Sequence, residues 1–165
     1  MLDLTFFETK FDIYPESIIS ENVTCFMIDA GDRDQLCIVG EGTAYPGTVY
    51  RQSGYVYTLS ELDHSAAVFL RKNFPFCAPA SILDRKITFG VGDRLGLAGP
   101  GHLRVFREYA AFPVLAQQSM RELTLTHRTM DDVIDTATFA VFRDGYRCGF
   151  GVDGDHLKTL EEVQQ

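Results

Sequence analysis

The chain has 165 residues, of which 45% are hydrophobic and 12% aromatic, enough for the core of one domain or of a small domain with part of a larger one. Its formal net charge of −8 argues against a nucleic-acid-binding surface. Residues 1–7 lack the basic start of a signal peptide, and no apolar run approaches the roughly 18–20 residues of a membrane span, so we expect a soluble, cytoplasmic protein that binds neither nucleic acid nor membrane.

The charge is unevenly distributed along the chain. Residues 84–128 carry seven basic and four acidic side chains, a local charge of +3, whereas both flanking parts are negative. This basic middle could hold an anionic small molecule, although a solvated surface would give the same count.

The four cysteines show neither metal-site nor redox spacing. They are Cys25, Cys37, Cys77 and Cys148. Buried or partly buried thiols in a reducing cytosol are therefore expected.

Residues 1–80 are predicted to form an N-terminal β-rich segment with one helix. Val23–Ile28 and Leu36–Val39 are β-rich runs separated by a turn-rich stretch, which indicates a hairpin. Residues 48–57 add further strand-like residues. Ser60 has the position of an N-cap for a helix over residues 61–73. Pro75 and Pro79 follow this helix and indicate a linker at the end of the segment.

This first segment shows no chemistry of its own. His64 lies inside the predicted helix without a partner group nearby in the sequence, so we expect a surface histidine.

Residues 81–165 repeat one unit three times: an apolar strand, a polar loop and a helix. The predicted strands are Ile87–Val91, Phe112–Ala116 and Cys148–Val152. We expect them to be adjacent and parallel, so that the loops after them share the face where α/β proteins bind ligands. The fold class is therefore α/β.

The first loop, residues 92–101, is rich in glycine and leads into a helix predicted over residues 102–109. Its free backbone N–H groups at a helix start would favour an anion. The glycine spacing matches neither a P-loop nor a dinucleotide fingerprint, and a generic glycine-rich turn is the alternative.

The second loop contains Ser119 and Glu122, which could form a capping box. Residues 123–127 do not obviously start a helix, and Thr129 is a better N-cap, for a helix over residues 130–143 that Gly145 ends. Glu122, just past a strand end and beside Gln118 and Ser119, is well placed to move protons.

The third loop, residues 153–158, places two carboxylates, an imidazole and an ammonium within six residues. A solvated charged turn is the alternative. Strand alternation would point Asp153 and Asp155 one way and His156 and Lys158 the other. Thr159 is the predicted N-cap of a final helix with Glu161 and Glu162 in its first turn.

Three stretches resemble the tagaturonate epimerase family, enzymes of hexuronate catabolism. They are GVGDRLGL at 90–97 with PGH at 100–102, FPVLAQQSMREL at 112–123, and GFGVDGDHLKT at 149–159. The resemblance covers at least residues 87–160. It implies a metal-dependent (β/α) TIM-type barrel of which residues 81–165 form about three βα units, in a chain that stops where a barrel needs more strands.

The resemblance also implies the activity, interconversion of D-tagaturonate and D-fructuronate, and the site. Its expected catalytic residues are Glu122, Asp155 and His156, and its expected substrate-binding residues are Asp93, Arg94, Gln118, Ser119 and Lys158. A divalent metal cation is expected as cofactor, with unknown ligands mostly outside this chain. The expected partners are a small-molecule sugar acid and a second chain that completes the barrel.

Two alternatives remain open for the sequence. One is a metal-dependent aldolase or isomerase of another ketose or sugar acid, for which the same three loops would serve. The other is a non-catalytic fragment, whose strand edges would be open.

Overall fold

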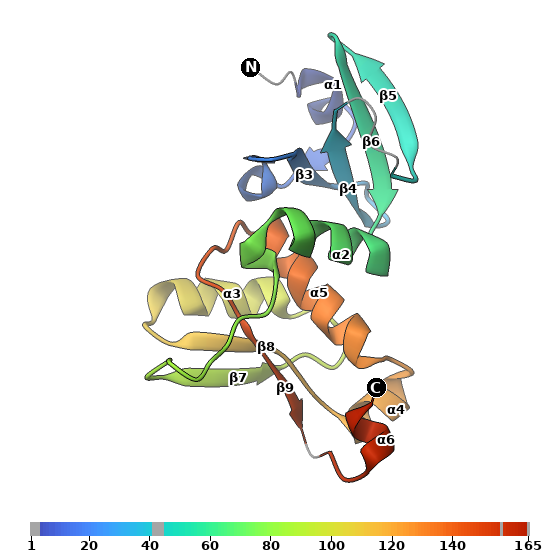
Figure 1. Ribbon diagram of the computed structural model, residues 1–165. Helices are drawn as coiled ribbons and strands as arrows, with labels where there is room; N and C mark the ends of the chain where they lie inside the picture. Colours follow the sequence, from blue (N-terminus) through green and yellow to red (C-terminus); the bar gives the residue numbers. More distant parts are fainter. Residues whose placement is uncertain (1–3, 41–44, 156, 165) are drawn as a thin grey trace.

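The computed structural model describes residues 4–40, 45–155 and 157–164 (Figure 1). It contains two sheets and a layer of helices between them. In chain order the elements are α1 (Thr5–Glu8), β1 (Asp12–Ile13), η1 (Pro15–Ser17), β2 (Ile19–Ser20), β3 (Thr24–Asp29), β4 (Asp34–Val39), β5 (Thr48–Gln52), β6 (Tyr55–Glu61), α2 (His64–Asn73), η2 (Pro75–Cys77), β7 (Thr88–Gly92), α3 (Gly99–Glu108), β8 (Phe112–Ser119), α4 (Met120–Thr126), α5 (Met130–Arg143), β9 (Gly151–Asp155) and α6 (Leu160–Val163).

The first sheet is antiparallel, with strand order β1-β3-β4-β6-β5 and β2 beside β3. The hairpin predicted from the two β-rich runs is confirmed, because β3 and β4 pair from Thr24–Val39 to Asp29–Asp34. A second hairpin joins β5 and β6 through Ser53 and Gly54, both at positive φ, as a two-residue turn between twisted strands requires.

Each face of this sheet packs against a different layer. One face forms an aromatic cluster with α1, which includes Phe7, Phe26 and Tyr57. The opposite face, with Met27 and Leu36, joins the main core. The alternation of side chains along a strand places neighbouring residues in the two clusters.

The helix after β6 begins later than predicted. Ser60 is not its N-cap, because the pairing of β6 with β4 extends to Glu61 and the Ser60 hydroxyl donates to the Pro46 carbonyl at 2.7 Å. Asp63 caps the helix instead, with its carboxylate accepting the N–H of Ala66 at 2.8 Å.

The second sheet has the order β7-β8-β9, and both pairings are parallel. The prediction of three adjacent parallel strands is confirmed. The third strand lies three residues later than predicted, because Gly149 has a left-handed φ of +84° and Phe150 instead bridges to Pro79. Asp153 and Asp155 therefore belong to β9 itself and not to a loop after it.

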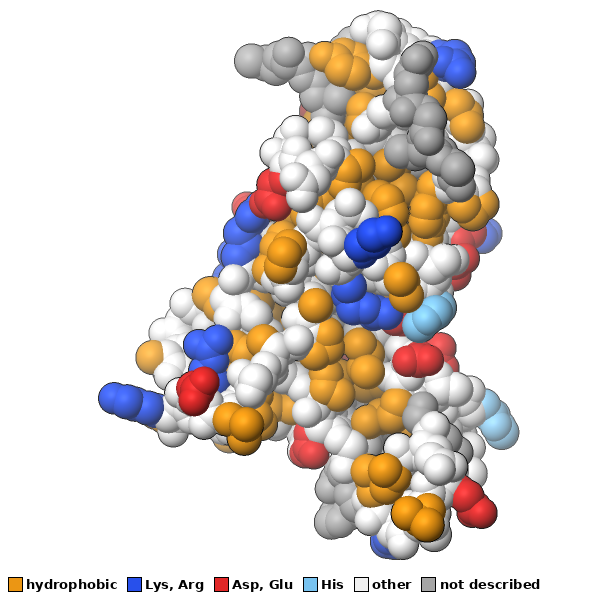
Figure 2. All heavy atoms as spheres, in the orientation of Figure 1, with side chains coloured by type: hydrophobic (Ala, Val, Ile, Leu, Met, Phe, Trp, Pro, Cys, Tyr) orange, Lys and Arg blue, Asp and Glu red, His pale blue; other side chains and the backbone are white. Residues whose placement is uncertain are grey.

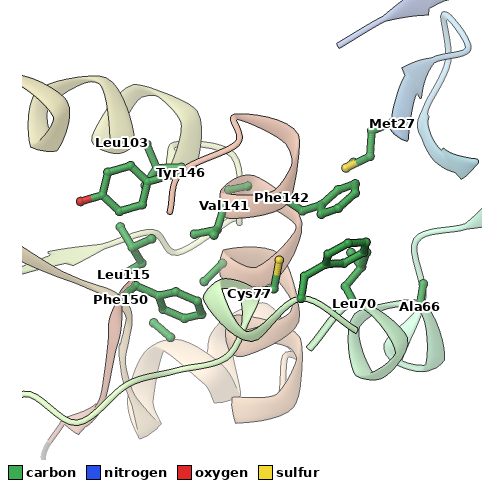
Figure 3. Packing of buried hydrophobic residues seen from close by; sticks show 14 of the residues in the cluster. Met27, Ala66, Leu70, Cys77, Leu103, Leu115, Val141, Phe142, Tyr146 and Phe150 are labelled. Atoms are coloured by element: carbon green, nitrogen blue, oxygen red, sulfur yellow. The ribbon is translucent and has the colours of Figure 1, made fainter. Parts of the chain in front are cut away.

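Helix α5 is the centre of the helix layer and packs against α2, α3 and β8. Figure 3 shows Val141 and Phe142 of α5 between Leu70 on one side and Leu103 on the other. The core is therefore continuous between residues 1–80 and 81–165. The boundary near residue 80 stays a prediction.

Residues 120–126 form α4, so the expectation that this stretch is not helical is wrong. Ser119 is its N-cap, and Leu123 is buried. The hydroxyls of Thr124 and Thr126 donate back to the carbonyls of Met120 and Glu122 at 2.9 and 2.7 Å. Capping and burial thus outweigh the weak helix propensity of the threonines.

The predicted caps of the last two helices, α5 and α6, are confirmed. Thr129 caps α5 and Thr159 caps α6, each with a capping box. Gly145 has a left-handed φ of +56° just past α5. Helix α3 starts at Gly99, three residues before the predicted position, because Pro100 is accepted in a first turn that needs no N–H donor.

All four cysteines are free, and three of them are buried; Cys148 is exposed. Burial raises the pKa of the Cys25 thiol to about 12. In the described part of the chain, no helix combines the length and apolar character needed to cross a membrane. Figure 2 shows acidic and basic side chains interspersed on the face it presents.

Candidate functional site

The carboxyl ends of β7, β8 and β9 lie at one edge of the parallel sheet, since the strands are parallel and adjacent. Figure 1 shows α4 and α6 together beyond the ends of β8 and β9. Open α/β sheets bind ligands at this edge. The predicted site residues that the structure describes lie at or near this edge, and their functional roles stay predictions.

The loop after β7 is organised around Asp93. One carboxylate oxygen accepts the N–H groups of Gly96 and Leu97 at 2.9 and 3.0 Å, and the other accepts those of Ala98 and Gly99 at 2.7 and 3.2 Å. The N–H groups that the sequence offered to an anion are thus bonded within the chain. These bonds favour a role for Asp93 in shaping the loop.

Arg128 connects this loop to α5 through hydrogen bonds. Its guanidinium donates to the carbonyls of Asp93 and Arg94 at 3.3 and 3.2 Å, and to the carbonyl of Asp132 and hydroxyl of Thr136 at 3.0 and 2.7 Å. Arg128 was not predicted from the sequence, because only the fold brings the carbonyls of Asp93 and Arg94 to its guanidinium.

Arg94, held by this loop, forms an ion pair with Glu122 through its Nε. The Arg94 side chain is 74% exposed and that of Glu122 is 23% exposed. Ser119 accepts the backbone N–H of Glu122 at 3.4 Å, which is one half of a capping box. The Glu122 carboxylate contacts Arg94 instead of completing that box, so a base candidate and a cation from two successive βα units meet at the sheet edge.

The two adjacent glutamines of β8 point in opposite directions. Gln118 is only 1% exposed, and neither polar atom of its amide has a hydrogen-bond partner among the residues that the structure describes. Its strand partner Gly154 faces Met130 of α5, on the helix-covered side. Gln118 is therefore a buried polar group, which is costly and is found mainly where a structure has a specific use for it.

Gln117 lies on the other, open face of the sheet, where its amide Nε2 donates to Asp153 Oδ2 at 3.2 Å. Neither Gln117 nor Asp153 was among the site residues predicted from the sequence. The pairing of β8 with its neighbours shifts register between Val114 and Ala116, and this shift changes which glutamine faces outward.

The third cluster is only partly described. Asp155 ends β9 opposite Ser119, while its side chain and all of His156 lie outside the described residues. Lys158 is exposed, and its backbone N–H donates to the Glu162 carboxylate. The predicted roles of Asp155, His156 and Lys158 stay predictions.

The described residues do not make a metal site by themselves. Within residues 4–40, 45–155 and 157–164, no group of three or more His, Cys, Asp or Glu side chains is placed to hold a metal ion. Of the nearby donors, the Glu122 carboxylate is paired with Arg94 and Asp153 with Gln117.

His64 is a surface residue as expected, with its side chain 57% exposed, but it has a partner from a distant part of the chain. Its Nδ1 lies 2.8 Å from Oδ2 of the buried Asp135, whose other oxygen accepts from Arg71 at 2.7 Å. The contact joins α2 to α5, which are 71 residues apart in sequence at this pair.

Comparisons with known proteins agree with the fold. The tagaturonate/fructuronate epimerase of Thermotoga maritima is 34% identical over 161 residues, which are 95% of this chain and 33% of the relative. A glycerol complex of fructuronate-tagaturonate epimerase UxaE from Cohnella laeviribosi superposes with a TM-score of 0.85 at 41% identity, covering 97% of this chain and 33% of that one. The native structure of that enzyme gives 0.84 at 41% identity, covering 97% and 34%.

The chain thus spans about a third of the length of these relatives. The family model described as tagaturonate epimerase matches residues 14–165. The chain belongs to the tagaturonate epimerase family.

Proposed function

We propose that this chain carries part of the active site of a cytoplasmic epimerase that interconverts D-tagaturonate and D-fructuronate in hexuronate catabolism. The observation that carries the proposal is the Arg94–Glu122 pair at the carboxyl edge of the parallel sheet. The names of the relatives from Thermotoga maritima and Cohnella laeviribosi support the substrates.

The two ketouronates differ at one carbinol carbon, β to the ketone, whose C–H proton is not acidic. Direct deprotonation therefore cannot invert this centre. In a retro-aldol step, a base takes the carbinol hydroxyl proton and the bond to the α-carbon breaks, leaving an enediolate and an aldehyde. Rotation of the aldehyde before the bond forms again inverts the centre.

Glu122 is the proposed base for the carbinol hydroxyl, and Asp155 or His156 returns the proton from the opposite face. Arg94 and Lys158 hold the substrate carboxylate. Arg94 contacts Glu122 through Nε, which leaves its terminal nitrogens for that carboxylate. One cation then orients both the base and the substrate.

Ser119 and Asp93 complete the proposed substrate site at this edge, whereas the Gln118 amide is buried on the helix-covered side and its substrate-binding role stays a prediction. The Ser119 hydroxyl accepts from the Glu122 N–H and still has its own proton to donate to a substrate oxygen. Asp93 acts through the loop whose N–H groups it binds, because that loop carries Arg94.

We also propose a divalent metal cofactor. A metal of this kind would act as a Lewis acid toward negative charge that develops on the substrate oxygens. His156 and Asp155 have donor atoms suited to a metal, and most of its ligands are proposed to lie in the part of the family protein that this chain does not span.

The sheet is proposed to be three βα units of a (β/α) barrel. Within the described residues, β7 and β9 each pair only with β8, and the exposed side chains at β7 include Ile87 and Phe89, 62% and 63% exposed. Leu160 and Val163 of α6 are also exposed, and Figure 2 shows hydrophobic side chains at the surface in that region. Further parallel strands, from the remainder of the protein or from a second chain, would cover these groups.

The test is a chimaera in which this chain replaces the matching third of the Thermotoga maritima relative, assayed by NMR with D-tagaturonate and a panel of divalent metals. We expect conversion to D-fructuronate, and Glu122→Gln should lower the rate by at least ~10²-fold with an unchanged melting temperature. In D₂O the inverted carbon should keep its own hydrogen, because the retro-aldol route never breaks that C–H bond. A folded chimaera without turnover contradicts the proposed function, and unchanged turnover of Glu122→Gln contradicts the role of Glu122.

A further inference from the structure

The open face of the parallel sheet carries a second polar group beside the Arg94–Glu122 pair. Val91, Ala116 and Val152 pack into the main core on the side of α3 and α5, which lie on one side of β7–β9 in Figure 1. Gly90, Gln117 and Asp153 belong to the opposite face. They come from three adjacent strands and contact one another.

A glycine is required at position 90 for this contact. A Cβ atom on Gly90 would lie 2.4 Å from Gln117 Oε1 and 3.0 Å from its Nε2, both too close. The Gln117 amide therefore fills the space that any other residue on β7 would occupy. From there its Nε2 donates to Asp153 Oδ2 at 3.2 Å, which fixes the amide across the sheet.

The Gln117 amide and the Asp153 carboxylate together favour a ligand with hydroxyl groups. After its bond to Asp153, the amide retains one N–H donor and a carbonyl acceptor, and the exposed Asp153 carboxylate adds acceptors. Hydroxyls on adjacent carbons donate and accept, so they can satisfy both kinds of group. A carboxylate only accepts, and Asp153 would repel it.

The position suits the same substrate as the proposed active site. Gln117 pairs with Gly92, where β7 ends and the loop carrying Arg94 begins. A sugar acid whose carboxylate binds Arg94 would extend its hydroxyl-bearing carbons along the sheet toward Gln117.

We propose that Gln117 and Asp153 form a hydroxyl-binding subsite for the sugar acid, built over Gly90. The subsite rests on the proposed function, since the ligand is the epimerase substrate. It orients the carbon chain, while Glu122 acts on the carbinol.

The chain offers a matched pair of variants. Gly90→Ala would displace the Gln117 amide, which is the far end of a flexible side chain, so the fold should be kept. Gly92→Ala changes the same strand in the same way, but its new Cβ meets nothing closer than the Gln117 carbonyl at 3.8 Å. Gln117→Leu removes the amide while keeping a side chain of similar bulk.

The experiment titrates the 165-residue protein with D-tagaturonate and follows backbone and side-chain amide signals by NMR. The Gln117 side-chain amide should shift in the wild type and in Gly92→Ala. Gly90→Ala and Gln117→Leu should each weaken binding about tenfold, the loss expected for about one hydrogen bond to a charged or well-ordered partner. Propionate, a carboxylate without hydroxyls, should shift Arg94 signals and leave the Gln117 amide unchanged.

The outcomes separate the subsite from the proposed function. Shifts at Arg94 and Glu122 without a shift at Gln117, or wild-type affinity in both Gly90→Ala and Gln117→Leu, overturn the subsite alone. If D-tagaturonate binds neither to this chain nor to the chimaera with the Thermotoga maritima relative, the proposed function and the subsite are both overturned.

Discussion

At the residue scale, two side chains away from the proposed chemistry determine where Arg94 lies. Asp93 binds the backbone of its own loop, and Arg128 joins that loop to Asp132 and Thr136 of α5. Gly96, at φ +74°, allows the close approach, since a Cβ there would lie 3.1 Å from an Arg128 nitrogen. The loop is thus set by hydrogen bonds to polar groups and not by packing.

Arg128→Ala should therefore loosen the loop. We expect a loss of about 1–3 kcal/mol in the free energy of unfolding, because several acceptors lose one shared donor group. The amides of Gly96 and Leu97 should exchange hydrogen faster, and Arg128→Lys should recover only part of the loss, because an ammonium lacks the planar fork. Arg104→Ala, which changes an exposed arginine on α3, is the control and should leave these exchange rates unchanged. If Gly96 and Leu97 exchange as slowly in Arg128→Ala as in the wild type, Arg128 does not have this role.

At the element scale, the helix starts depend on single caps. Asp63 caps α2 by accepting the Ala66 N–H, and this hydrogen bond lowers the pKa of its carboxyl. The Ser65 hydroxyl also donates to Asp63, at 2.8 Å. Asp63 is thus the residue at which β6 changes into α2.

Asp63→Ala should lower the free energy of unfolding by about 1 kcal/mol, the usual cost of losing an N-cap. Thr129→Ala, at the start of α5, should cost a similar amount for the same reason. Urea titrations of both variants measure the change. The difference in the free energy of unfolding between the wild type and Asp63→Ala should shrink as the pH falls through the lowered pKa of Asp63, because the wild-type carboxylate is then protonated. A difference that does not change with pH would argue against the cap.

Three parts of the chain meet at Asp34 of β4, which accepts hydrogen bonds from Tyr14, just before η1, at 2.8 Å and from Arg143 of α5 at 3.0 Å. The Arg143 guanidinium also lies over the Tyr14 ring, 5.1 Å from its centroid. Burial first, and then the hydrogen bond to Asp34, raise the pKa of Tyr14 from 10.0 to about 12. The contact therefore depends on a neutral tyrosine.

Stability from this group should be fully present below pH 10.0 and be lost as the pH rises to about 12, because the folded state holds the proton more tightly than the unfolded state. The comparison is with Tyr14→Phe, which lacks the titrating hydroxyl but keeps the ring. The difference in unfolding free energy between the two proteins should decrease across this range. Curves that stay parallel would contradict the assignment.

At the scale of the whole molecule, the two sheets share one core through α2 and α5, yet the part of the parallel sheet that the structure describes has three strands. Catalysis requires groups held to within a fraction of an ångström, which a closed barrel provides and open edges do not. The described residues also contain no group of three or more His, Cys, Asp or Glu side chains that could hold the proposed metal.

The 165-residue protein alone should therefore show little or no epimerase activity, even with added divalent metal. An NMR assay with D-tagaturonate and a metal panel measures this, with a full-length family member as the positive control. Turnover near that of the full-length enzyme would contradict both the need for further strands and the placement of the metal ligands outside this chain.

The amino-acid sequence by itself determined the order of strands and helices wherever the signal is local. The hairpin of β3 and β4, the caps Thr129 and Thr159, and the parallel order of β7, β8 and β9 follow from short-range patterns and a common connection rule. The motifs at 90–102, 112–123 and 149–159 also identified the family, which the comparisons confirm.

Only the tertiary structure decided which groups meet. The register shift between Val114 and Ala116 turns Gln117 outward and buries Gln118, and alternation counted along the sequence cannot reveal a shift that depends on the neighbouring strands. The partners of Arg94 and His64, and the loop carbonyls that Arg128 binds, likewise come from distant parts of the chain. A local pattern predicts an element, but a contact between side chains depends on how the elements pack.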